Sequence, residues 1–377
     1  MHNDWITKIE ICNKLEVSPR TVQRMVHRGE IRKKQIGYSM YYQVVDPTYV
    51  QPESKITSTH GPPSIINIPV PKSSYDKGQH TKNYNEQITS YLNALATIAN
   101  AVTFEYSSPK PQSDTSLCLL LSDTHIGQKT NYYNSKIGCE AISEEIPELI
   151  LDAQLPFDIG EVVILLGGDM IEGEDIYQTQ PHHIDLTAIE QVEKISSAIM
   201  LLAKQLNSMF DCPVKIETVP GNHGRVSRTA DERSNWDNVV YQNLALASSI
   251  AKGYNPNFGI TVNKNFNQTN VFKIQGHKVM LYHEGPKHTG TPAMKIKLAG
   301  WFKTHQWDVM ACGHWHEWSI GGLFGKPVIK NGSLVGYNDL AERMGVYDPP
   351  RQAWWLMTKE KALSVAGYLE FKHARIG

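Results

Sequence analysis

Several features that would restrict the function of this chain are missing from its sequence. No apolar run approaches the length of a transmembrane helix, and the polar N-terminus carries no signal peptide, so we expect neither a membrane span nor secretion. The 5 cysteines are scattered, odd in number and without a Cys-x-x-Cys pair. This pattern favours buried thiols in a reducing cytoplasm over a disulfide framework. We find no internal repeat.

Net charge is also nearly absent. The 37 basic and 38 acidic residues cancel almost completely, so bulk charge indicates neither nucleic acid nor membrane as a partner. Between residues 20 and 34, however, cations accompany only one acid, Glu30. These cations are Arg20, Arg24, Arg28, Arg32, Lys33 and Lys34. The length of 377 residues allows two or three domains.

Residues 1–46 have the pattern of a compact unit. A helix beginning at Thr7 is followed by Ser18-Pro19, an N-cap with proline at the first helical position. The second helix covers Arg20–Arg28 and ends at Gly29. Residues 31–36 and 38–44 alternate around Gly37 and predict a small β-hairpin.

Residues 47–83 are rich in proline, serine and threonine, which is the composition of a flexible linker. Apolar residues at helical spacing then predict a connecting helix within residues 84–107. This helix either packs against the domain that follows or pairs two subunits into a homo-oligomer. The remaining residues, 108–377, form one predicted domain. In it, strands alternate with helices at 140–151, 188–210 and 236–251, and from about residue 259 strands dominate, with one helix at 292–302. This order indicates a mixed α/β sandwich.

Five polar motifs, each directly after a short apolar run, are the most informative feature of this domain. They are Asp123-Thr124-His125, Gly168-Asp169, Gly221-Asn222-His223, His283-Glu284 and Gly313-His314-Trp315-His316. Such runs indicate buried strands, and ligands in α/β sheets gather at the carboxyl ends of strands. We therefore expect these side chains to meet at one place.

The residue types suit divalent metals, which in hydrolases take oxygen and imidazole ligands and leave positions open for water and substrate. Two ions about 3.5–4 Å apart can clamp the attacking and leaving oxygens of a phosphoryl displacement. Asp169, alone after its strand, is the natural bridging carboxylate. Asp123 and His125 lie two residues apart and point to the same side, as do His314 and His316.

Together these motifs resemble those of the calcineurin-like metallophosphoesterase superfamily over roughly residues 117–336. The resemblance implies a four-layer α/β/β/α sandwich with a binuclear site. It implies that one metal is held by Asp123, His125, Asp169 and His316, and the other by Asp169, Asn222, His283 and His314. It further implies that His223 lies beside the metals and protonates the leaving oxygen.

The sequence departs from the superfamily after Gly221-Asn222-His223, where many members have an acidic residue that orients the histidine. Here Gly224-Arg225 follows instead. Arg225 either clamps a substrate phosphate, assisted by Arg228 or Arg233, or pairs with Asp231 or Glu232 on a solvated loop. We interpret Glu172, Glu174 and Asp175 as a solvated acidic loop, and His182 and His183 as surface residues. Lys287, His288, Ser333, Tyr337 and Asn338 are further candidates for lining the cleft.

Residues 1–46 resemble helix-turn-helix modules of the excisionase and MerR-like type, with a small wing. The resemblance places the helix 20–28 in a DNA major groove and the wing on phosphates. The predicted DNA contacts are Arg20, Gln23, Arg24, Arg28, Arg32, Lys33 and Lys34. The alternative is a protein-binding or structural helical module.

The sequence thus predicts a phosphodiesterase that uses two metal ions, a DNA nuclease, tethered to a DNA-binding module. Resemblance to superfamily nucleases of DNA repair suggests manganese, although the ligand set alone also admits iron or zinc. The combination of modules resembles phage-encoded proteins, which act in the host cytoplasm. One alternative is a phosphatase or phosphodiesterase for nucleotides or phosphoprotein, with a regulatory helix-turn-helix. The other is a DNA-binding regulator with an idle metal domain.

Overall fold

The computed structural model describes residues 6–7, 11, 14–15, 22, 31–36, 39–44, 113–177, 180–255, 258–285, 292–336 and 348–373. The chain divides into two units, Met1–Ser90 and Tyr91–Gly377. The predicted linker, 47–83, and the predicted connecting helix, 84–107, lie outside the described residues. The domain boundaries therefore stay predictions.

The first unit contains a three-stranded antiparallel sheet. Its strands, in spatial order, are β1 (Ile6–Thr7), β3 (Ser39–Val44) and β2 (Ile31–Ile36). The pairing of β2 with β3 confirms the predicted hairpin. Ile11 and Val22 are helical and, like Ile31, buried. Arg32, Lys33 and Lys34 lie on β2, whereas the other predicted DNA contacts are outside the described residues. The helix-turn-helix stays a prediction.

A six-stranded mixed sheet is the centre of the second unit. Its strands, in spatial order, are β14 (Val365–Glu370), β13 (Arg351–Thr358), β4 (Thr115–Leu121), β5 (Glu161–Leu166), β6 (Val214–Thr218) and β7 (Ile260–Asn263). The four strands from β4 to β7 run parallel, and β13 and β14 pair antiparallel. The strands β4, β5 and β6 are thus neighbours, and their carboxyl ends meet at one edge of the sheet. Asp123, Asp169 and Asn222 follow these three strands in that order.

Helices cover one face of this sheet. They are α4 (Ser135–Glu140), the π-helical turn η1 (Ala141–Glu145), α5 (Ile146–Asp152), α6 (Ala188–Phe210) and α7 (Trp236–Tyr254). The helix α6 has the predicted bounds and begins with a capping box of Thr187 and Glu190. The first helix begins earlier than predicted, because the Asn134 side chain accepts the Ile137 N–H at 3.0 Å and caps it.

The second sheet has five strands. In spatial order they are β11 (Ser319–Leu323), β12 (Lys326–Lys330), β10 (Val309–Cys312), β9 (His277–Tyr282) and β8 (Thr269–Ile274). The helix α8 (Pro292–His305) packs on it through Leu298 and Trp301. A short 3-10 turn, η2 (Gln180–His182), precedes α6.

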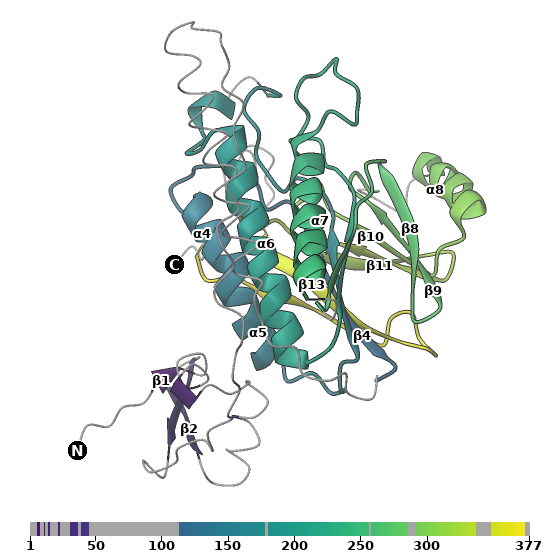
Figure 1. Ribbon diagram of the computed structural model, residues 1–377. Helices are drawn as coiled ribbons and strands as arrows, with labels where there is room; N and C mark the ends of the chain where they lie inside the picture. The colour runs from purple at the N-terminus through teal and green to yellow at the C-terminus, as the bar shows by residue number, and fades with distance from the viewer. Residues whose placement is uncertain are drawn as a thin grey trace, which may run out of the picture. The chain divides into compact units, whose positions relative to one another are not determined.

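Alternating side chains show how the layers stack. In β4, Leu117, Leu119 and Leu121 pack in the cluster shared with α4–α7, whereas Cys118 and Leu120 pack in a second cluster shared with the five-stranded sheet. A third cluster joins that sheet to α8. The layers are therefore helices, sheet, sheet and helix, with α6 and α7 on one side and α8 on the other (Figure 1). The predicted mixed α/β fold with two sheets is confirmed. Among the described residues, no helix is long and apolar enough to cross a bilayer.

Candidate metal centre

The five motifs converge where the strands end, and their backbone is unusual. Five residues have left-handed backbone angles, with φ of 52° at Asp123, 45° at His125, 52° at Asp169, 75° at His314 and 56° at His316. Residues other than glycine rarely adopt this region, and such conformations cluster at functional sites. They turn the chain sharply after β4, β5 and β10, where these side chains come together.

Two glycines of the motifs allow the loops to approach closely. A Cβ on Gly168, whose φ is +89°, would lie 2.6 Å from the Gly221 nitrogen. A Cβ on Gly313 would lie 2.6 Å from the Ser122 hydroxyl oxygen. Both separations are far below van der Waals contact, so these positions require glycine to bring the motifs together.

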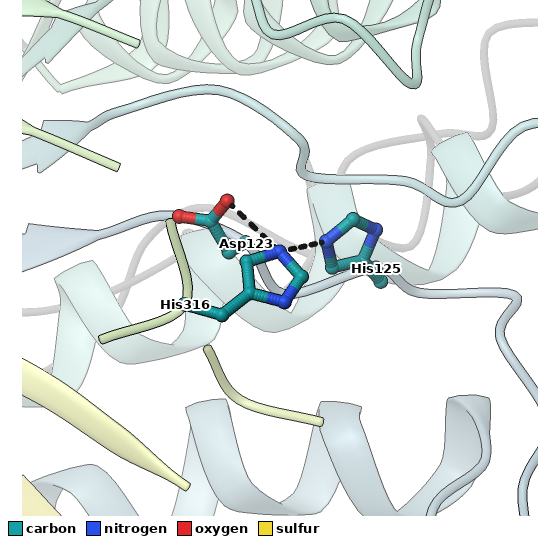
Figure 2. Close-up of side chains that lie close together, drawn as sticks. All are labelled: Asp123, His125 and His316. Carbon is teal, nitrogen blue, oxygen red and sulfur yellow. Dashed lines mark hydrogen bonds and ion pairs between the residues drawn. The ribbon is translucent and has the colours of Figure 1, made fainter. Parts of the chain in front are cut away.

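Asp123, His125 and His316 form the first group of facing donor atoms. His316 Nε2 lies 3.1 Å from His125 Nε2 and 3.4 Å from Asp123 Oδ1, and Figure 2 shows both contacts. Asp123 and His125 are buried, whereas His316 is half-buried. The backbone N–H of His314 donates to Asp123 Oδ1 at 2.9 Å, which joins the first motif to the last.

Asp169, Asn222 and His283 form the second group. His283 Nε2 lies 3.0 Å from Asp169 Oδ2 and 3.1 Å from Asn222 Oδ1. The His314 ring lies 5.2 Å from the His283 ring, measured between centroids. Asp169 also groups with His125 and His223, within 4.8 Å between donor atoms. Asp169 therefore stands between the two groups.

These distances fit divalent metal ions. Ligand atoms bound ~2.0–2.2 Å from a metal, at tetrahedral or octahedral angles, lie roughly 3–3.5 Å from one another. His283 Nδ1 donates to the Gly167 carbonyl at 2.7 Å, and His125 Nδ1 donates to Glu172 Oε2 at 2.9 Å. Each Nε2 is thus left facing the site, which is the arrangement that oriented metal-binding histidines have.

The electrostatics of Asp169 favour its charged form. Burial alone would raise its pKa, but the neighbouring His283 and His223 hold the pKa of this carboxyl well below its usual range. For His283 the balance is reversed: burial lowers its pKa, whereas Asp169 and Asp123 raise it to about 10. The buried Asp169 carboxylate therefore faces a protonated His283, and a bound metal ion would take the place of that proton.

Glu172 is a functional candidate that the sequence interpretation missed. The side chain is 5 % exposed, so the prediction of a solvated loop is wrong for this residue, although Asp175 is exposed as expected. Glu172 Oε2 accepts from His125 Nδ1 at 2.9 Å and lies 3.2 Å from His223 Nδ1. Glu172 therefore orients His223, in place of the acidic residue that is absent after Gly221-Asn222-His223 in this chain. The spacing Gly-Asp-x-x-Glu was its signal.

The charges of Glu172 and His223 support each other. Burial would raise the Glu172 pKa, but His223 and His125 lower it to about 2. Burial would lower the His223 pKa, but Glu172 and Asp169 raise it to about 9. Glu172 thus favours the protonated form of His223, which can give a proton to a leaving group.

Asp237, in the first turn of α7, was also missed. Its buried carboxylate accepts the backbone N–H groups of Asp169 at 2.9 Å, Met170 at 3.1 Å and Gly221 at 2.8 Å. It thereby fixes two motif loops to one helix end. No sequence motif marks it, because its partners are backbone groups of distant segments.

Tyr177, which is partly exposed, contacts two residues of the motifs. Its hydroxyl accepts from Asn222 Nδ2 at 2.8 Å, so that the amide oxygen of Asn222 turns toward His283. The Tyr177 ring lies 4.8 Å from the His223 ring, between centroids. Gln180 Oε1 accepts the N–H of Tyr177 at 2.9 Å and holds this segment in place.

The arginines of the neighbouring loop do not pair as the sequence allowed. Arg225 Nε donates to the Asn222 carbonyl at 2.9 Å, and Arg228 Nε donates to the Ile176 carbonyl at 3.0 Å. Asp231 pairs instead with Arg233, with 2.8 Å between Oδ2 and the terminal nitrogen.

The other candidates have different positions. His182 and His183 are exposed, as expected. Ser333 is buried, and its hydroxyl donates to the Asp123 carbonyl at 3.0 Å, so it supports the motif and does not line a cleft. Lys287, His288, Tyr337 and Asn338 lie outside the described residues.

Comparison with known proteins agrees with this geometry. A model of the calcineurin-like phosphoesterase family matches residues 118–318, just over half of the 377 residues. The chain therefore belongs to this family, whose members use divalent metals, and all seven predicted ligands fall within the match. The search of curated proteins gave no match.

Solved structures show only distant likeness. A hypothetical protein from Pyrococcus horikoshii is 12% identical, with a TM-score of 0.34, covering 69% of this chain and 89% of its own. A structure described as a novel archaeal phosphodiesterase is 14% identical, with a TM-score of 0.32 and coverage of 68% and 99%. Vacuolar Protein Sorting 29 from Cryptosporidium parvum is 16% identical, with a TM-score of 0.31 and coverage of 68% and 98%. Likeness at this level carries no information on substrate.

Proposed function

We propose that the protein is a phosphodiesterase that works with two divalent metal ions and cleaves DNA. The observation that carries the proposal is the convergence of two groups of donor atoms on Asp169. One ion would be held by Asp123, His125, Asp169 and His316. The other would be held by Asp169, Asn222, His283 and His314. Asp169 would belong to both sets.

The chemistry follows from the positions of the side chains. Two bound ions would supply Lewis-acid activation of water and neutralise charge on the phosphoryl oxygens. The new bond forms between a water oxygen and phosphorus, and the bond from phosphorus to the leaving oxygen breaks. His223, held by Glu172 at 3.2 Å, gives its proton to that leaving oxygen. Asp237 keeps the loops that carry Asp169 and Asn222 in register.

DNA as the substrate rests on the first unit. Its hairpin carries Arg32, Lys33 and Lys34, and Arg24 and Arg28 lie in the preceding segment. Cations of this kind bind phosphates and raise the local concentration of DNA near a tethered active site. Manganese is our choice of working metal, because oxygen and imidazole ligands in equal measure suit it.

The experiment is a hydrolysis assay of the full chain, stripped with chelator and reloaded with Mn²⁺, Fe²⁺ or Zn²⁺. The substrates are bis(4-nitrophenyl) phosphate, single- and double-stranded DNA, and RNA. We expect chelator to abolish cleavage of the small diester and of DNA, and His223→Ala to reduce cleavage of DNA, whose leaving alkoxide needs a proton. The exposed His182→Ala is the matched control. Cleavage of the small diester without any polymer would refute the nuclease assignment, and no hydrolysis with any metal would refute the enzyme.

A further inference from the structure

A rim beside the metal centre consists of the exposed Tyr177, whose ring contacts His223, the exposed Arg228, which contacts the carbonyl next to Tyr177, and the half-buried Arg225, which contacts the carbonyl next to His223. We propose that this rim, made by Tyr177, Arg225 and Arg228, binds a single-stranded nucleotide on the leaving-group side of the scissile phosphate. Tyr177 stacks on an unpaired base, and the arginines contact the flanking phosphate. The inference rests on the proposed function, since His223 defines the leaving-group side.

Tyr177 has the geometry of a fixed stacking platform. Its side chain is anchored at one end by the hydroxyl contact to Asn222, and its ring is tilted 44° to the His223 ring. Nevertheless, 38 % of the residue is exposed. The N–H groups of Ile176 and Tyr177 both donate to Gln180 Oε1, at 2.7 and 2.9 Å, which holds the backbone still. An exposed aromatic face beside a phosphate-cleaving centre is suited to a nucleobase.

Arg225 and Arg228 are held in place without being neutralised. Each uses its Nε to donate to a backbone carbonyl, and the contact of Arg228 with the Ile176 carbonyl joins the loop before α7 to the segment of Tyr177. Neither forms an ion pair with any residue that the structure describes. Arg233, on the same loop, differs: its Nε and a terminal nitrogen both contact Asp231, at 2.9 and 2.8 Å. Unpaired guanidinium groups are suited to phosphate oxygens.

The chemistry favours a single strand over a duplex or a phosphopeptide. Bases within a duplex already stack on each other, so a protein ring reaches only an unpaired or extruded base. A phosphopeptide would use the arginines but leave the ring without a flat partner. Base stacking on an aromatic side chain contributes about 1–3 kcal/mol, so removing the ring should weaken binding about 5- to 150-fold.

The test measures binding without turnover. The full chain, loaded with metal, is titrated into a phosphorothioate trinucleotide that carries the fluorescent base 2-aminopurine. We expect the fluorescence to be quenched by stacking in the native protein and in Tyr177→Phe, which keeps the ring. In Tyr177→Ala the quenching should vanish and affinity should fall about 5- to 150-fold relative to Tyr177→Phe.

The arginines are tested in the same assay. Arg225→Gln with Arg228→Gln should weaken binding and reduce its salt dependence by about 0.7 per lost phosphate contact in log–log slope. Arg233→Gln is the matched control and should bind as the native protein does. If the double variant binds and responds to salt as Arg233→Gln does, the arginines are not part of a phosphate site.

Two further results would overturn the proposal. One is equal quenching and affinity in Tyr177→Ala and Tyr177→Phe. The other is displacement of the trinucleotide by a phosphopeptide as readily as by an unlabelled trinucleotide. Hydrolysis of bis(4-nitrophenyl) phosphate reports on the metal centre separately. If quenching is present in the native protein and lost in Tyr177→Ala, but the native protein hydrolyses no diester, the proposed function is refuted and the rim is not. If the native protein hydrolyses the diester but does not quench the fluorescence, the rim alone is refuted.

Discussion

Replacing Glu172 by glutamine should impair proton delivery to the leaving group more than any other step. The carboxylate contacts His125 Nδ1 at 2.9 Å and His223 Nδ1 at 3.2 Å, and it is almost fully buried. Both imidazoles contact the same oxygen, Oε2, while Oε1 accepts from Gln180 Nε2 at 3.3 Å, so either orientation of a glutamine amide would turn its nitrogen toward one of these donors. The charge that raises the His223 pKa is also removed.

The size of the effect depends on the leaving group. Loss of a residue that orients a metal ligand or its partner costs about 10- to 100-fold in metal affinity or activity. For DNA, whose alkoxide needs a proton, we expect the loss in kcat at saturating metal to reach that range. For a 4-nitrophenyl ester, whose leaving group departs without protonation, the loss should be much smaller.

The pH profile gives a second readout with a definite sign. Burial lowers the His223 pKa and Glu172 with Asp169 raises it, to about 9 in total. The general acid is protonated below that pKa, so activity on DNA should fall as pH rises through about 9. In Glu172→Gln the falling limb should move to lower pH.

The matched control is Glu174→Gln, two residues along the same segment. Glu174 is half-buried and accepts the Ala188 N–H at the start of α6, away from the metal centre. It should retain native activity on both substrates. Equal losses for DNA and the nitrophenyl ester in Glu172→Gln, with an unmoved pH profile, would contradict the positioning argument.

Three further predictions concern metal binding, the first unit and the core. Burial lowers the His283 pKa, but Asp169 raises it to about 10, so His283 must lose a proton when a metal binds and metal affinity should rise with pH. Calorimetry in two buffers should show proton release, and a pH-independent affinity would contradict this prediction. Arg24→Ala with Arg28→Ala should weaken binding of duplex DNA and leave turnover of the small diester intact; equal loss of both would contradict separate modules. Trp355→Ala removes a fully buried side chain between the sheets and should reduce the free energy of unfolding, measured by urea titration, by about 3–5 kcal/mol. A reduction below about 1 kcal/mol would contradict the packing of this cluster.

Much of the second unit is predictable because its signals are local. The strands β4 and β5 end in unbroken apolar runs and β10 consists of one, and α6 has both a periodic apolar face and a capping box within its own sequence. Three of the motifs follow β4, β5 and β6, so their meeting at one edge follows from the parallel pairing of these strands. The other two follow β9 and β10, which pair parallel in the second sheet. The meeting of these side chains could therefore be predicted without coordinates, and their role as metal ligands stays a prediction.

What the sequence could not supply depends on contacts between distant segments. Asp237 matters because its carboxylate accepts N–H groups from two other loops, and a backbone N–H leaves no mark in a sequence. Tyr177 lies in a polar segment without periodicity, and its role appears only when its hydroxyl meets Asn222. The left-handed backbone at Asp123 and His314 is equally invisible, since neither residue type demands it.

The most direct test of a shared metal centre is the metal content of Asp169→Asn. Metal per chain is measured after equilibration at several free Mn²⁺ concentrations, with Asp175→Asn, an exposed acid on the same segment, as control. We predict two ions per chain in the native protein and the control, and weakened binding of both ions with no turnover in Asp169→Asn. Loss of one ion while the other binds with native affinity, or full activity in that variant, would contradict a bridging Asp169.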